Sequence, residues 1–371
     1  MKVFRSLLML SLLSMGMAGC EDNSAITLGF LGGLSGRATD LGGTARNGMQ
    51  LAVEEVNAKG GIHGKPVEMI IKDDKQDPET ARQATQELVR AGVNAIIGPV
   101  TSTIAVSVAD IVNDAGILML GVTVTTNELS DINDQFIRML SPTSVYADTF
   151  ARYLFSDRKI HSYAVIYDLG NRAYTESWVS DFSRRFKALG GIETAAETFT
   201  SGDSDSLMRS AQKVLAQPCD MVILVANSVD AAMLAKLVRE AKPDQALSTS
   251  EWAGTERLIE LGGRYVEGAL VQQHLDRESQ DADFQNFREA FVRRFNQEPG
   301  FAGMLAYNGT HLVLKSIQEK GPDQTLRDYI LDKSVFPGIQ GPTRFNKFGD
   351  ASAKTYVTEI REGRFKVIKQ L

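Results

Sequence analysis

The stretch from Asn94 to Ser130, NAIIGPVTSTIAVSVADIVNDAGILMLGVTVTTNELS, predicts a buried strand, a turn, a helix and a second strand in that order. Ala95 to Ile97 is an apolar run typical of a buried strand, and Ser102 precedes apolar residues at helical spacing. In open parallel sheets, ligands bind beyond the carboxyl ends of the strands. We therefore expect Ser102 to cap a helix whose first N–H groups attract an anion such as a ligand carboxylate.

Strands and helices alternate in the same way along most of the chain. Apolar runs and helical patterns alternate from Ile26 to Leu120, and a second alternation begins after Ser141 and continues to Gln272. This alternation predicts an α/β fold whose parallel sheets are covered by helices on both faces. At 371 residues, the chain is long enough for two such units.

Composition and motifs argue against several functional classes. The net charge is −6, without a basic run, which argues against nucleic acid as a partner. The four histidines and two cysteines do not cluster, which argues against a structural metal site. The glycine-rich loop Leu31 to Gly36 matches neither the dinucleotide fingerprint nor the nucleophile elbow, although its Ser35 is a candidate ligand contact. We therefore predict that the protein is not an enzyme and holds no cofactor or metal.

The first twenty residues have the pattern of an export signal. Lys2 and Arg5 precede a short apolar stretch, and Met17-Ala18-Gly19-Cys20 ends it. This segment resembles a bacterial lipoprotein signal. The resemblance implies a signal peptide at residues 1–19 and a lipid on Cys20 that anchors the protein to a membrane. An ordinary secretory signal is the alternative. We expect a location in the cell envelope, facing the periplasm or the outer face of the cytoplasmic membrane.

Several phrases match one protein family in the same order along the chain. They are Leu51 to Gly64 (LAVEEVNAKGGIHG), Ile97 to Ser102 (IGPVTS), the loop holding Tyr174, Val266 to Gly268, and Phe345 to Asp350. Together they resemble the leucine/isoleucine/valine-binding type of periplasmic binding protein. The resemblance covers essentially the whole chain after residue 20.

The resemblance implies a fold, a domain division and a function. The fold is the type I periplasmic binding fold, with two Rossmann-like lobes of parallel sheet joined by a three-strand hinge. Lobe I is expected at residues 20–141 plus 273–353, and lobe II at residues 142–272 plus 354–371. Proteins of this type close on a small ligand, deliver it to an ABC permease and perform no chemistry on it.

The resemblance also implies a role for individual residues. Ser102 and Thr126 correspond to residues that hold the ligand carboxylate, and the backbone carbonyl of Val124 faces the ligand ammonium. Tyr174 corresponds to the tyrosine of lobe II that closes over the ligand. Glu251 corresponds to the acid that pairs with the α-ammonium, an interaction that strengthens when water leaves the cleft.

Two departures from the family pattern affect the expected ligand. Gly121-Val122-Thr123-Val124 replaces the usual serine-proline sequence, so that Thr125 can take the place of Thr126. Leu41 stands where branched-chain binders often have tyrosine. We expect an aliphatic or branched-chain amino acid as the ligand. The alternative is that the same fold binds an amide, urea or a carboxylic acid, or that it serves as a ligand sensor for a signalling partner. Trp252 is expected to pack under its loop, outside the site.

Overall fold

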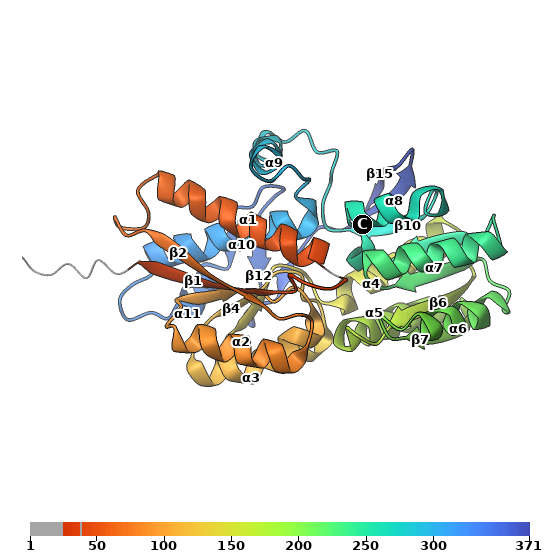
Figure 1. Cartoon of the computed structure of the whole chain (residues 1–371), viewed down its shortest axis with the longest axis horizontal. Helices are drawn as coiled ribbons and strands as arrows, with labels where there is room; N and C mark the ends of the chain where they lie inside the picture. The colour runs from red at the N-terminus through yellow and green to blue at the C-terminus, as the bar shows by residue number, and fades with distance from the viewer. Residues whose placement is uncertain (1–24, 38) are drawn as a thin grey trace, which may run out of the picture.

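The computed structural model describes residues 25–37 and 39–371 (Figure 1). The predicted signal peptide, residues 1–19, and the predicted lipidation site at Cys20 lie outside the described residues. No helix in the part of the chain that the structure describes is long and apolar enough to span a membrane.

The first sheet has five parallel strands in the order β2-β1-β3-β4-β5. Its central strands are short apolar runs that are buried on both faces, as helix-covered parallel strands require. The strands are β1 (Ile26–Gly32), β2 (Val67–Asp73), β3 (Ala95–Ile97), β4 (Met119–Gly121) and β5 (Phe136–Arg138). The strand-turn-helix-strand unit predicted at Asn94 to Ser130 is therefore present at the centre of this sheet.

Helices cover both faces of the first sheet (Figure 1). One face carries α1 (Thr39–Ala58) and α10 (Gly300–Glu319), and the other carries α2 (Pro78–Arg90) and α3 (Ser102–Ala115). Helices α1 and α10 approach closely at Gly48, where an added Cβ would lie 2.1 Å from the carbonyl oxygen of Gly303. Glycine is required at this position because any side chain would separate the two helices.

The second sheet has seven strands in the order β15-β14-β10-β9-β8-β6-β7. Five strands are parallel, and the last two form a terminal hairpin in which β14 pairs antiparallel with both β10 and β15. The strands are β6 (Ser162–Asp168), β7 (Ile192–Phe199), β8 (Met221–Val225), β9 (Ala246–Thr249), β10 (Leu270–Gln273), β14 (Tyr356–Arg361) and β15 (Arg364–Gln370). The α/β architecture with two mainly parallel sheets, predicted from the sequence, is confirmed.

Helices also cover both faces of the second sheet. Alternate residues of β6 and β8 pack against α4 and α5 on one face and against α6 and α7 on the other. The aromatic residues Trp178, Phe182 and Phe186 of α5 are buried in this core, as predicted. The helices are α4 (Thr143–Arg152), α5 (Arg172–Ala188), α6 (Ser204–Leu215), α7 (Ser228–Ala241) and α8 (Glu256–Gly262).

The chain passes between the two sheets three times. It leaves the first sheet after β5, leaves the second sheet after β10, and returns to the second sheet at β14. The segment between β10 and β14 contains α9 (Ala282–Phe295), α10, α11 (Leu326–Lys333) and the small antiparallel sheet β11 (Val335–Phe336), β12 (Thr343–Phe345) and β13 (Ala351–Ser352).

Several element boundaries differ from those expected from the sequence. Tyr174 lies in the first turn of α5, not in a loop. Val266, in one of the phrases that resemble the family, follows a short 3-10 turn (Gly263–Tyr265), and the next strand begins only at Leu270. Periodicity does not resolve such short turns at the ends of helices and strands.

Candidate ligand site between the lobes

Helix α3 begins at the carboxyl end of β3, as predicted, but Ser102 does not cap it. Thr101 occupies the N-cap position without a side-chain hydrogen bond. Ser102 is the first helical residue, and its Oγ accepts from the N–H groups of Thr125 at 3.2 Å and Thr126 at 3.3 Å. The prediction of a Ser102 cap is wrong because these two amides, 23 and 24 residues further along the chain, compete for the same hydroxyl.

Contacts with the core and with Arg138 hold the loop that follows β4 in place. The side chain of Val124 is buried in the apolar core beside α3. Thr126 caps a short 3-10 turn (Asn127–Leu129) by accepting from the N–H of Glu128. The buried Arg138 donates to the carbonyl oxygen of Thr126 at 2.7 Å and pairs with Asp350. These contacts fix the two amides that bind Ser102.

Glu251 is the main polar group on the side of the cleft opposite Ser102. It lies in a 3-10 turn (Glu251–Ala253) directly after β9 and is 4% exposed. Its Oε1 accepts a hydrogen bond from the hydroxyl of Tyr146 at 2.6 Å, whereas Oε2 has no partner within residues 25–37 and 39–371. Burial raises the pKa of Glu251 to about 7. None of the described residues that line its cavity is a lysine or arginine, so this buried carboxyl group has no cation beside it in the described part of the chain.

Tyr146 links the two sides of the site and was missed by sequence reasoning. Its hydroxyl lies 3.0 Å from Oγ1 of Thr125 as well as 2.6 Å from Glu251. Because one hydroxyl has one proton, Tyr146 donates to one of these groups and accepts from the other. Its position on α4 carries no distinguishing motif, and only its place just after the crossing at Ser141 could have drawn attention to it.

Two aromatic residues complete the wall beside Glu251. The ring of Tyr174 meets the ring of Trp252 edge to face, with centroids 5.8 Å apart. Neither the Tyr174 hydroxyl nor the Trp252 Nε1 has a hydrogen-bond partner within the described part of the chain. Trp252, which was expected to pack outside the site, lines the same cavity as Glu251.

The cavity at this position is small. About 10 Å³ of it can be reached by the centre of a water molecule, so that an amino acid enters only if the lobes or the lining side chains move. Among the predicted contacts, Leu41, Tyr174 and Glu251 line it, whereas Ser102, Val124, Thr125 and Thr126 lie behind it and Ser35 is exposed. The lining residues are Leu41, Val100, Thr123, Asn171, Tyr174, Glu251, Trp252 and Phe301. The sequence offered no local signal for Val100, Asn171 or Phe301, which resemble ordinary core or turn residues.

Direct contacts between the lobes explain the narrow cavity. The Asp40 carboxylate accepts from Ser228 at 2.7 Å and from Thr255 at 2.5 Å. Arg37 pairs with Asp230 at 2.6 Å. Asn227, and not Ser228, caps α7. The lobes are in a closed arrangement. Within residues 25–37 and 39–371, no cluster of His, Cys, Asp or Glu could hold a metal ion.

Comparison with known proteins identifies the family. A sequence model described as periplasmic binding protein matches residues 25–364. The chain belongs to the periplasmic binding protein family. The fold and the closed two-lobed site described above agree with this membership, which implies a location outside the cytoplasm.

Relatives of this family member include branched-chain amino acid binders. The chain is 23% identical to the Leu/Ile/Val-binding protein BraC3 of Rhizobium johnstonii over 335 residues, which covers 89% of this chain and 90% of that protein. It is 25% identical to the Leu/Ile/Val-binding protein of Escherichia coli over 341 residues, covering 90% and 89% of the two chains. These relatives are binding proteins, not enzymes.

Solved structures of the family confirm the fold. The branched-chain amino acid transporter substrate-binding protein LivJ of Streptococcus pneumoniae, in complex with isoleucine, has a TM-score of 0.86 at 23% identity and covers 93% of this chain and 100% of its own. A solute-binding protein of an ABC transporter from R. palustris, in complex with benzoate, has a TM-score of 0.82 at 17% identity, with 94% and 96% covered. The predicted type I periplasmic binding fold is confirmed, and this periplasmic binding protein has a solute-binding role.

Proposed function

We propose that the protein captures a free aliphatic α-amino acid between its two lobes and delivers it to an ABC permease. The observation that carries this proposal is the buried carboxyl of Glu251, whose Oε2 has no partner within the described residues. A buried carboxylate is stable only with a cation or several donors, and the ammonium of an amino acid supplies both. The proposed lobes are residues 20–141 plus 273–353 and residues 142–272 plus 354–371.

The two ends of the ligand have separate binding groups in this proposal. Ser102 holds the carboxylate through its hydroxyl, near the positive end of α3, and Thr126 or Thr125, whose amides hydrogen-bond to Ser102, assists it. The ammonium pairs with Glu251, beside the free hydroxyl of Tyr174. The carbonyl of Val124 is a further acceptor for the ammonium.

The remaining wall favours an apolar side chain. Leu41, Val100, Trp252 and Phe301 contribute apolar surface to the cavity. Burial of each methylene group stabilises the complex by about 0.8 kcal/mol. An aliphatic side chain fits this lining better than a charged one, for which the cavity has no partner apart from Glu251.

A carboxylic acid without an amine is the second candidate ligand. Since the pKa of Glu251 is about 7, a large fraction of this group is neutral at neutral pH. A neutral carboxyl can donate a hydrogen bond to an acidic ligand. The benzoate complex of the structurally similar R. palustris protein agrees with this alternative. Two further alternatives are that the ligand is an amide or urea, and that the protein serves as a ligand sensor for a signalling partner.

A thermal-shift screen tests the proposal. We expect aliphatic amino acids to raise the melting temperature of the purified protein more than matched amides or carboxylic acids do. Ser102→Ala is expected to weaken the best amino-acid ligand. If only ligands without an amine stabilise the protein, the assignment of Glu251 to the ammonium is wrong. If Ser102→Ala leaves the affinity for the best ligand unchanged, the assignment of Ser102 to the carboxylate is wrong.

We also propose that residues 1–19 are a signal peptide and that Cys20 carries a lipid that anchors the protein at the membrane. The sequence Met17-Ala18-Gly19-Cys20 supports this proposal. Cell fractionation checks it. The unmodified protein is expected in the membrane fraction and Cys20→Ser outside it. An unmodified protein that is released without lipid would instead indicate an ordinary secretory signal.

A further inference from the structure

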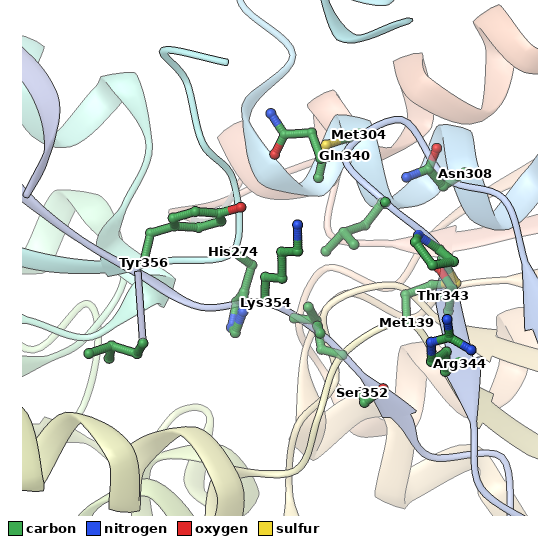
Figure 2. Close-up of a pocket in the computed structure, with 16 residues that line it drawn as sticks. Met139, His274, Met304, Asn308, Gln340, Thr343, Arg344, Ser352, Lys354 and Tyr356 are labelled. Carbon is green, nitrogen blue, oxygen red and sulfur yellow. The ribbon is translucent and has the colours of Figure 1, made fainter. Parts of the chain in front are cut away.

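A second cavity lies where the chain crosses between the two sheets (Figure 2). About 380 Å³ of it can be reached by the centre of a water molecule, far more than between the lobes. All three crossings contribute to its wall, through Leu140 after β5, His274 after β10 and Lys354 before β14. We call this space the hinge cavity. The proposed amino-acid site does not use it.

His274 is a buried polar group of the hinge cavity without a partner. It is 5% exposed, and neither ring nitrogen completes a hydrogen bond in the part of the chain that the structure describes, although the backbone of Lys354 lies close enough to act on its pKa. Burial lowers the pKa of His274 to about 4, so the ring is neutral at pH 7 and has one N–H donor. A buried donor without an acceptor destabilises the folded protein. An oxygen atom in the cavity would satisfy it.

The charged side chains of the hinge cavity are all cationic. Arg344 and Lys354 line it, and no Asp or Glu does. Both side chains are exposed, and neither takes part in an ion pair within the described residues. Figure 2 shows Lys354 beside His274. The cations and the ring N–H all favour an anion with oxygen acceptors.

The rest of the hinge cavity is largely apolar. Met139, Leu140, Met304 and Leu305 line it. Methionine side chains adapt to ligands of different shape because they are flexible and polarisable. This surface favours an organic body over a bare inorganic anion.

We propose that the hinge cavity is a second ligand site, for a small organic carboxylate. The carboxylate pairs with Lys354 and accepts a hydrogen bond from His274, and Arg344 adds positive charge elsewhere on the wall of the cavity. The apolar part of the ligand packs against Met139 and Met304. This site lies next to the proposed amino-acid site, since the ring of His274 meets the ring of Tyr146 edge to face at 5.1 Å. The proposal does not depend on which ligand binds between the lobes.

Calorimetric titration with hexanoate, in the absence of amino acids, tests the hinge cavity. We expect the purified protein to bind hexanoate and not the matched neutral compound hexanamide. The double variant Arg344→Met/Lys354→Met is expected to bind hexanoate at least tenfold more weakly. The control Arg209→Met/Lys347→Met removes the same charge at exposed residues that do not line the cavity, and it should bind as the unmodified protein does.

Further variants separate the hinge cavity from the site between the lobes. Glu251→Gln is expected to change the affinity for leucine and to leave hexanoate binding unchanged. The proposal is overturned if the unmodified protein does not bind hexanoate, if both double variants weaken it equally, or if Glu251→Gln alters hexanoate affinity while Arg344→Met/Lys354→Met does not. Failure of leucine to bind contradicts only the proposed amino-acid site.

Discussion

The hydroxyl of Tyr146 lies 2.6 Å from Oε1 of Glu251, although the two residues are 105 positions apart in the sequence. The same hydroxyl lies 3.0 Å from Oγ1 of Thr125, so that a hydrogen-bonded path joins the two sides of the cleft. The proposed ammonium site and the proposed carboxylate site are therefore connected through one side chain. This path accounts for how a carboxyl group without a cation is held in a buried site.

Removing the Tyr146 hydroxyl is expected to weaken ligand binding. The hydrogen bond from Tyr146 favours the charged form of Glu251, so Tyr146→Phe raises the pKa of that carboxyl further. Loss of a hydrogen bond to a charged group costs about 1.5–3 kcal/mol, or about a tenfold to hundredfold loss of leucine affinity at pH 7. Calorimetry measures this loss. Tyr167→Phe, at a half-buried tyrosine of β6, serves as the control.

Affinity for an amino acid is expected to rise with pH. Pairing with an ammonium requires the charged form of Glu251, whose pKa in the free protein is about 7. Below that pH, binding must release a proton, and affinity rises about tenfold per pH unit; above it, affinity levels off. Titrations at pH 5 to 8 in buffers of different ionisation enthalpy measure both effects. A ligand that binds with proton uptake would indicate the carboxylic-acid alternative.

The contacts of Asp40 are expected to favour the closed state. Asp40 accepts hydrogen bonds from Ser228 and Thr255 across the cleft. Asp40→Ala removes both, and we expect at least about a tenfold loss of ligand affinity, since each hydrogen bond to a charged group contributes about 1.5–3 kcal/mol. Small-angle scattering without ligand should show a larger radius of gyration for Asp40→Ala than for the unmodified protein. Glu79→Ala, in the first turn of α2, is the control, and an equal effect there would contradict a specific role of Asp40.

Breaking the buried Arg138–Asp350 ion pair is expected to destabilise the fold. Arg138 is 0% exposed and also supports the carbonyl of Thr126. Asp350→Ala leaves the buried charge of Arg138 unpaired, which lowers the free energy of unfolding by about 3–5 kcal/mol. Chemical denaturation measures it. The double variant Arg138→Met/Asp350→Leu should cost less than the single one. A single variant that costs no more than Asp110→Ala, which breaks an exposed pair, would contradict this account.

The sequence predicted the sheets better than the details of the site. Apolar runs such as Ala95 to Ile97 depend on local composition, and the strands lie where such runs occur. The hydrogen bonds of Ser102 depend on a loop more than twenty residues away, so helix-capping rules assigned the hydroxyl incorrectly. Tyr146 and Phe301 resemble core residues in sequence, because nothing local shows that folding places them near Glu251.

The most direct test of the central claim is a calorimetric comparison of leucine with 4-methylpentanoate, which lacks only the amine. If Glu251 binds the ammonium, the unmodified protein should prefer leucine by about a hundredfold or more, because the analogue leaves a buried polar group unpaired. In Glu251→Gln the preference should fall to about tenfold or less, since the charge is lost but a similar shape remains. Equal affinity of the unmodified protein for both compounds, or an unchanged preference in Glu251→Gln, would contradict the proposed amino-acid site.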